Sequence, residues 1–313
     1  MSAGPQKADL KERLERARQA QKKAQAHGDG SEATQQPEAQ AQVTQNDKSG
    51  PRDQSIADLR LDSFLENNQK LAKGKSQLPN LAVQTRIFPP TRKGRRKFYK
   101  DWKNVPVLGR QDVTIWQRFF QLNQLDLTGW IVLIKYLDPS SMISTFSQRQ
   151  FLKTMRRQDS SRDYQWLRSF LDRISGTQFA IYVHHQDQSW ERYTGSLAPQ
   201  GLEASQGSHA VQLSKPLYAF FGFDGWSYIN LDQRLALGQR EWAQAFHAYL
   251  STHQCPENGL WWRKKDLLDQ WGSEYKSMRN FMDLFRRRVL KPLYDIEFIK
   301  KVEEKETAIG LWW

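Results

Sequence analysis

Apolar side chains recur at helical spacing in two pairs of consecutive segments. Residues 147–157 and 160–175 form the first pair, and residues 260–271 and 274–291 form the second. In each pair, the second segment has an apolar stripe on one side and Arg, Lys, Gln or Asn on the other. A short helix, a tight connection and a polar-faced second helix indicate a helix-turn-helix, and the strand-like sequence after it extends it to a winged helix.

The segments around the first pair predict the rest of one domain. Ser147 and Ser160 are suited to cap its two helices. Hydrophobic periodicity and turn residues indicate the other elements. We expect a strand at 98–108, a helix at 112–123 capped by Asp112, a buried strand at 130–136, a hairpin of 179–184 with 189–193, a polar loop at 195–208 and a returning strand at 210–213. This order predicts a winged-helix domain over residues 79–222.

The second pair lies in a similar succession of elements. We expect a long helix at 230–252, a turn at 255–259, the helices 260–271 and 274–291 separated by Gly272 and a capping Ser273, and a terminal hairpin of 294–299 with 307–312. Pro292 is expected to end the second helix, because proline interrupts a helix interior. The result is a second winged-helix domain over residues 223–313. No sequence identity links the two units, so the repeat is architectural.

Composition separates these domains from residues 1–78. That segment is rich in Gln, Ala, Lys, Glu and Ser and nearly free of aromatic residues. It cannot bury enough surface to offset the entropy of ordering, so we expect a disordered tail. The predicted fold class is therefore α+β, with two tandem winged-helix domains after a disordered N-terminal tail.

Polar character and cysteine content predict a cytoplasmic protein that is not bound to a membrane. The longest apolar run, around residues 131–134, is far shorter than the roughly 20 residues that a membrane span needs. Residues 1–25 lack the apolar core of a secretory signal. Cys255 is the only cysteine, so neither a disulfide nor a cysteine zinc site can form within one chain.

Charge indicates nucleic acid as the partner. The formal net charge is +13 and the sequence pI is about 9.7, which favours polyanions. Basic residues gather in two places: Arg92, Lys93, Arg95, Arg96, Lys97, Lys100 and Lys103, and Arg286, Arg287, Arg288 and Lys291. The first group is interleaved with aromatic residues. It is either a DNA arm for the minor groove or backbone, a basic linker, or a solvated strand edge.

The polar faces of the two second helices supply the candidate DNA contacts. Arg can pair with guanine and Asn with adenine, while Lys and flanking Arg suit phosphates. For helix 274–291 the candidates are Lys276, Ser277, Arg279, Asn280, Arg286 and Arg287, and for helix 160–175 they are Ser161, Gln165 and Arg168. The alternative for each helix is a charged face that contacts only solvent. The first helix is less basic, because Asp163 and Asp172 lie nearby.

The sequence offers no active site. His184 and His185 are adjacent in an expected strand, so they point to opposite faces and cannot bind one metal ion together. No phosphate-binding P-loop, GxSxG or HExxH segment is present. We therefore expect a protein that is not an enzyme and needs no metal and no cofactor.

Three segments resemble the TrfA-type plasmid replication initiators: residues 109–117 (GRQDVTIWQ), residues 144–147 (STFS) with the two helices after them, and residues 241–253 (EWAQAFHAYLSTH). The resemblance spans roughly residues 80–300 and is one of pattern and order. It implies binding of double-stranded DNA at the iterons of a plasmid origin, origin opening, copy control and recruitment of the host initiator, helicase and sliding clamp. It also implies a possible homodimer.

Two features depart from that family. Residues 124–143 form an extra segment in the first unit, and the clamp-binding peptide has an altered start and spacing. Its candidate anchors are Leu59, Leu61 and Phe64. A sequence-specific repressor on the same fold and a metal-dependent origin nickase are the alternative functions.

Overall fold

The computed structural model describes residues 74–91, 96–107, 112–138, 140–184, 190–203, 207–221, 225–272 and 275–313. All of them belong to one compact unit, residues 53–313. The expected clamp-binding anchors Leu59, Leu61 and Phe64 lie outside the described residues, as does most of the expected tail. The tail ends before residue 78, however, because Lys75–Pro79 form a strand in which Leu78 is fully buried.

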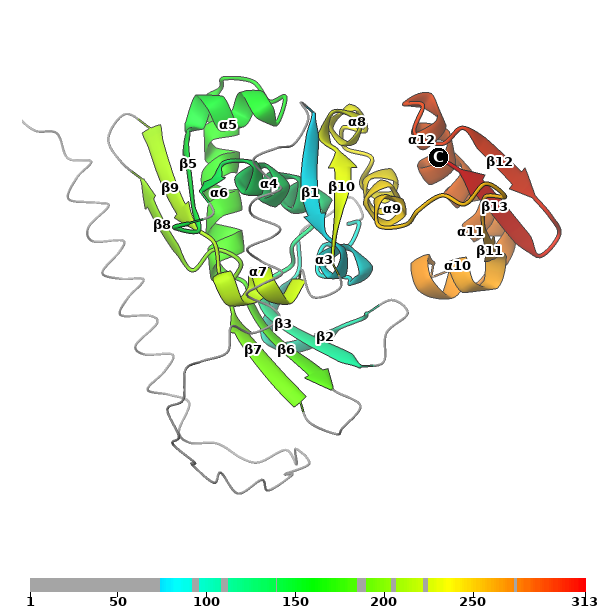
Figure 1. Cartoon of the computed structure of the whole chain (residues 1–313), viewed down its shortest axis with the longest axis horizontal. Helices are drawn as coiled ribbons and strands as arrows, with labels where there is room; N and C mark the ends of the chain where they lie inside the picture. The colour runs from blue at the N-terminus through cyan, green and yellow to red at the C-terminus, as the bar shows by residue number, and fades with distance from the viewer. Residues whose placement is uncertain are drawn as a thin grey trace, which may run out of the picture. The chain divides into compact units, whose positions relative to one another are not determined.

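The first part of the described fold contains two four-stranded antiparallel sheets, ordered β2-β3-β6-β7 and β4-β5-β9-β8 (Figure 1). Its elements are β2 (Phe98–Val105), β3 (Val113–Phe120), α4 (Gln124–Lys135), β4 (Leu137–Asp138), β5 (Ile143–Ser147), α5 (Gln148–Thr154), α6 (Ser161–Gly176), β6 (Gln178–His184), β7 (Trp190–Gly195), β8 (Gln200–Glu203), β9 (Ser208–Gln212) and α7 (Lys215–Phe221).

The second part is built from helices and a three-stranded sheet ordered β11-β13-β12. Its elements are α8 (Leu231–Ala236), α9 (Glu241–Ser251), β11 (Leu260–Arg263), α10 (Lys264–Trp271), α11 (Met278–Phe285), the π-helical segment η2 (Arg286–Leu290), α12 (Lys291–Asp295), β12 (Lys301–Glu304) and β13 (Ala308–Trp312). Before them, β1 (Lys75–Pro79) pairs antiparallel with β10 (Trp226–Asn230), and α3 (Asn80–Gln84) follows β1.

One order of elements occurs twice. Helix α4, strand β5, helices α5 and α6, and strands β8 and β9 follow one another in the first part. Helix α9, strand β11, helices α10 and α11, and strands β12 and β13 follow in the second. Strand β9 pairs with β5 and β8 in the first part, and β13 pairs with β11 and β12 in the second. The first part differs in that β4 lies between α4 and β5, and in that β6 and β7 are inserted between α6 and β8. Strand β6 pairs with β3 and β7, and β3 also pairs with β2.

Two hydrophobic cores lie beneath these elements. The first includes Trp130, Phe151 and Phe170, and the second includes Phe246, Phe281 and Phe285. Ile229 and Leu231 belong to the first core and Leu237 to the second. Ala248 of α9 also belongs to the first core and Phe246 of the same helix to the second, so α9 contributes to both cores.

Two predictions for the first part were wrong in the type of element. The segment predicted as helix 112–123 is strand β3, in which Val113, Ile115 and Gln117 are buried at alternate positions. The segment predicted as a strand at 130–136 lies in helix α4, where every residue from Leu127 to Ile134 is buried. A helix that is apolar on all sides lacks the helical periodicity by which we distinguish it from a strand.

Other boundaries also changed. The expected helix 230–252 is two helices, separated at Gly238, whose φ of 58° lies in the left-handed region. Leu260–Arg263 is a strand paired with β13 and not the start of a helix. The loop expected at 195–208 contains β8. The predicted helices at 147–157 and 160–175 and the hairpin after them are confirmed as α5, α6, β6 and β7.

The expected helix 274–291 begins later and ends later than predicted. Ser277 is the capping residue, and its hydroxyl accepts a hydrogen bond from the Asn280 N–H at 3.4 Å. Pro292 does not end the helical run, which continues through η2 and α12 as far as Asp295. The terminal hairpin therefore starts at Lys301 instead of residue 294.

Candidate nucleic-acid interface

The N-terminal end of α11 presents polar side chains to solvent. Arg279 and Asn280 are exposed in its first turn, and Lys276 is exposed just before it. On the other face, Phe281 and Phe285 are fully buried. The polar end of α11 thus combines guanidinium and amide donors with the unpaired N–H groups and positive dipole end of a helix, which attract anions.

Arg286 is exposed but is held by two carboxylates. Its Nη2 and Nε donate to Glu304 of β12 at 2.6 and 3.0 Å, and its Nη1 donates to Asp283 at 2.8 Å. Lys264, the first residue of α10, lies 2.7 Å from the same Glu304 carboxylate. Hydrogen bonds from Arg286 and Lys264 lower the pKa of Glu304 to about 2. Arg287 is exposed and donates from Nε to the Asp283 carbonyl at 3.2 Å.

We expect the Glu304 contacts to stabilise the fold above pH 4.5 and to be lost in acid. The pKa of Glu304 is depressed in the folded chain, so its contribution is fully present above the ordinary value of 4.5 and disappears as pH falls towards about 2. Urea unfolding of Glu304→Gln and the parent should therefore differ by about 1 kcal/mol at neutral pH, with solvent screening included, and should converge near pH 2. A constant difference across this range would contradict the assignment.

Helix α6 presents a less basic surface. Ser161, Gln165 and Arg168 are all exposed. The Nη2 of Arg168 donates to Glu203 of β8 at 3.1 Å. Glu203 also accepts from Gln148 Nε2 at 3.2 Å. Both α6 and α11 therefore carry exposed polar residues near their N-terminal ends, and an arginine in α6 and another in η2, directly after α11, are each paired with a glutamate of the neighbouring hairpin.

The basic segment before the first sheet is partly described. Residues 92–95 lie outside the described residues, and Phe98–Val105 form the edge strand β2. Lys97, Lys100 and Lys103 are exposed, and Trp102 lies under the Arg118 guanidinium at 4.7 Å from the ring centroid. The structure therefore makes the described portion a solvated strand edge with both aromatic and basic side chains.

A buried polar network joins the two parts. Arg234 of α8 is fully buried and donates to the Thr128 hydroxyl, to the carbonyls of Gln124 and Gln244, and to Gln124 Oε1, each at 2.9 Å. Burial lowers the pKa of Arg234 to about 9, so it stays charged at neutral pH. Glu241 of α9 accepts from Asn123 Nδ2 at 3.0 Å. Sequence reasoning missed this network, since its members are scattered polar residues without a motif.

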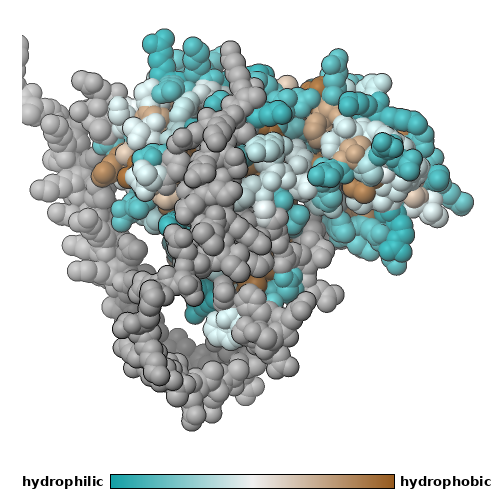
Figure 2. All heavy atoms as spheres, in the orientation of Figure 1, coloured by the Kyte–Doolittle hydropathy of each residue, from teal (hydrophilic) through white to brown (hydrophobic). Residues whose placement is uncertain are grey.

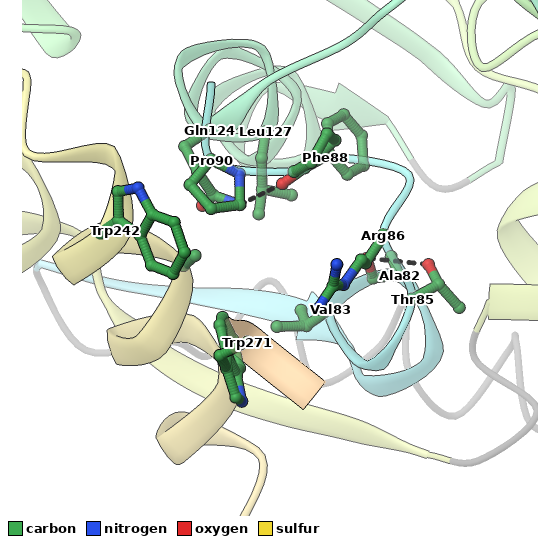
Figure 3. Close-up of a pocket in the computed structure, with 12 residues that line it drawn as sticks. Ala82, Val83, Thr85, Arg86, Phe88, Pro90, Gln124, Leu127, Trp242 and Trp271 are labelled. Carbon is green, nitrogen blue, oxygen red and sulfur yellow. Dashed lines mark hydrogen bonds between the residues drawn. The ribbon is translucent and has the colours of Figure 1, made fainter. Parts of the chain in front are cut away.

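A pocket of about 130 Å³ lies at the same junction (Figure 3). Trp242 and Trp271 line it from α9 and α10, and Pro90, Phe88 and Leu127 line it from the first part. Its lining is largely apolar and contains no ionisable pair that indicates chemistry. Trp242 and Trp271 lie in the expected helices 230–252 and 260–271, and only the packing of these helices brings the two side chains to one pocket.

The adjacent histidines of the expected strand are only partly described. His184 is exposed at the end of β6, and His185 lies outside the described residues. Within the described ranges, no group of three or more His, Cys, Asp and Glu side chains could hold a metal ion. None of the described helices combines the length and apolar character that crossing a membrane requires. Figure 2 shows a mainly hydrophilic surface over the C-terminal elements, with small hydrophobic patches.

Comparisons with known proteins identify the fold. No family model matches the chain. No curated protein matches it significantly. A crystal structure of domains 2 and 3 of RctB aligns with a TM-score of 0.51 at 12% identity, covering 75% of this chain and 98% of that one. A second RctB structure of domains 2–3 aligns with a TM-score of 0.46 at 15% identity, covering 74% and 95%. The chain thus has the mixed α+β fold of RctB domains 2 and 3.

Proposed function

We propose that this protein is a replication initiator that binds repeated duplex sites in an origin through two winged-helix units. The observation that carries the proposal is the repeated order of elements, in which a polar-faced helix is followed by a hairpin paired beside it. In a helix-turn-helix the N-terminal part of the second helix enters the major groove. The fold shared with two consecutive RctB domains supports the division into two units.

In the second unit, α11 is the proposed reading helix. Arg279 and Asn280 lie at the end that enters the groove, where they can pair with guanine and adenine. Lys276 and Ser277 precede them and suit a phosphate. Lys300 and Lys305 are exposed around the β12–β13 hairpin, the proposed wing, and extend the basic surface towards the DNA backbone.

In the first unit, α6 is the proposed second reading helix and the β8–β9 hairpin its wing. Ser161, Arg162 and Gln165 are the exposed residues nearest its N-terminal end. Arg162 is the one charged side chain among these three, whereas the N-terminal end of α11 presents both Lys276 and Arg279, so this unit relies less on phosphate attraction than the second unit. We propose that it contributes mainly to sequence recognition on a neighbouring groove.

The resemblance to TrfA-type initiators supplies the rest of the proposal. It supports plasmid iterons as the duplex sites, opening of the origin, copy control, recruitment of the host initiator, helicase and sliding clamp, and a possible homodimer, all in the cytoplasm. The protein would act by binding, without catalysing a reaction or using a cofactor. Footprinting on DNA that neighbours the gene, combined with a strand-opening assay in the presence of host initiator, tests this proposal.

A sequence-specific repressor is the second candidate, because the same two DNA-binding units would serve it equally well. The two functions differ in the step after binding. An initiator opens the origin strands together with the host initiator, whereas a repressor protects the site and leaves the duplex closed. Protection without opening would favour the repressor.

We expect Arg279→Ala to weaken binding to the specific site by about 1–3 kcal/mol, the value of one bidentate base contact. Thermal unfolding should stay nearly unchanged, because Arg279 is exposed. Binding isotherms and melting curves of the full chain measure both effects. Lys291→Ala is the matched control, since Lys291 is exposed further along the same helical run and pairs with Asp295 at 3.0 Å.

The pair of variants separates base contact from net charge. If Arg279→Ala and Lys291→Ala weaken binding equally, only the general attraction of a basic protein for DNA is at work. If neither variant changes binding, α11 is not the reading helix.

A further inference from the structure

The two units correspond at the level of single residues around their wings. In the first unit, Phe146 pairs with His209, and His209 pairs with Glu203, the last residue of β8. In the second, Trp262 pairs with Ile309, and Ile309 pairs with Glu304, the last residue of β12. Strand register thus makes Glu203 and Glu304 equivalent, although the sequences of the two units show no identity.

The partners of the two glutamates are equivalent as well. Gln148 is the first residue of α5 and Lys264 the first residue of α10, and each contacts its glutamate. Arg168 and Arg286 follow the capping serine of their helix at nearly the same number of residues. Arg168 donates to Glu203, the glutamate that Gln148 contacts, and Arg286 donates to Glu304, the glutamate that Lys264 contacts. In both units one carboxylate therefore joins the wing to both helices of the helix-turn-helix.

The contacts differ in strength between the units. Glu304 receives two hydrogen bonds from Arg286 and one ion pair from Lys264, which is only 15% exposed. Glu203 receives one hydrogen bond from Arg168 and one from a neutral glutamine. The Arg168 and Glu203 side chains are also more exposed, at 61% and 45%, than Arg286 and Glu304, at 43% and 30%. The second wing is consequently held more firmly.

Each glutamate is paired with an arginine that lies on the same side of its helix as the reading residues. Guanidinium groups bind carboxylate and phosphate oxygens with the same geometry. A carboxylate paired with a guanidinium neutralises much of its charge and uses some of its N–H donors, so a paired arginine attracts a DNA phosphate less strongly than a free one. The contact therefore reduces the attraction that any duplex would feel, whereas base contacts from Arg279 and Asn280 remain available.

We propose that Glu203 and Glu304 are equivalent positioning residues, which fix each wing against its helix pair and withhold Arg168 and Arg286 from DNA phosphates, thereby limiting binding to nonspecific duplex. This inference rests on the proposed DNA-binding function. It reassigns two of the residues that we expected to contact DNA, because the structure pairs both with carboxylates.

The test compares Glu304→Gln with Glu303→Gln in the full chain. Both variants remove one negative charge from the same strand, but the ion pair of Glu303 is with Lys301, 2.5 Å away on that strand, and not with a helix. Binding to a random-sequence duplex and to a footprinted site is measured across a salt series. The double variant Glu304→Gln with Arg286→Ala establishes whether any change acts through Arg286.

We expect Glu304→Gln to bind random duplex several-fold more tightly than Glu303→Gln and to steepen its log–log salt slope by about 0.9, the value for one added phosphate contact. The ratio of specific to nonspecific affinity should fall, and Arg286→Ala should abolish the gain. In the first unit, Glu203→Gln should cause the same changes at a smaller size, and the added substitution Arg168→Ala should abolish them. If Glu304 only stabilised the fold, Glu304→Gln would weaken binding to both duplexes and would not steepen the salt slope.

Two outcomes separate the failure of this inference from failure of the proposed function. If the parent protein binds neither duplex, the DNA-binding function itself is wrong. If the parent binds and Glu304→Gln matches Glu303→Gln in affinity and slope, or if the gain survives Arg286→Ala, the withholding role of Glu304 is overturned. Melting curves of each variant identify any loss of binding that arises from unfolding.

Discussion

Phe281→Ala is expected to lower the free energy of unfolding by about 3–5 kcal/mol, the usual cost of truncating a buried phenylalanine. The Phe281 ring is fully buried and packs against Phe285 and Tyr275, with ring centroids 5.7 and 6.0 Å away. It also covers Gly272 so closely that a β-carbon there would lie 2.3 Å from the ring. Removing the ring therefore leaves a cavity between α11 and Gly272.

Urea unfolding of the full chain measures this effect, and Arg279→Ala is the matched comparison on the opposite face. Phe281→Ala should lose stability first and DNA binding only as a consequence, whereas Arg279→Ala should do the reverse. If Phe281→Ala unfolds at the same urea concentration as the parent but fails to bind DNA, the two faces of α11 have been exchanged.

Arg234→Ala should be destabilising to a similar extent, about 3–5 kcal/mol, because it leaves buried acceptors without a donor. Four hydrogen bonds of 2.9 Å connect this fully buried guanidinium to Thr128, Gln124 and Gln244. Those residues lie on α4 and α9, so a single side chain holds the first helix of each unit.

The control for Arg234→Ala is Arg240→Ala, which removes the same side chain from an exposed position a few residues later. We expect the control to unfold within about 0.5 kcal/mol of the parent, as surface substitutions usually do. Denaturation followed by tryptophan fluorescence reports on both units. Equal stability of the two variants would show that the Arg234 hydrogen bonds only balance the cost of burying its charge.

Sequence alone determined the features that depend on neighbouring residues. Ser147, Ser160 and the stripe that contains Phe281 and Phe285 were placed correctly, because caps and helical periodicity act within one or two turns. The hairpin of β6 and β7 was predicted for the same reason. The net charge of +13, which supports an anionic partner, also needs no structure.

Tertiary structure decided what depends on distant partners. Val113–Phe120 is a strand because β2 and β6 flank it, and Leu127–Ile134 is a helix surrounded by protein on all sides, where its local pattern carries no period. Glu304 and Arg286 meet only after β12 pairs with β13, and Arg234 meets Thr128 only once the two units pack together. Periodicity records which side of an element is buried, whereas hydrogen-bond partners far along the chain are set by how the elements pack.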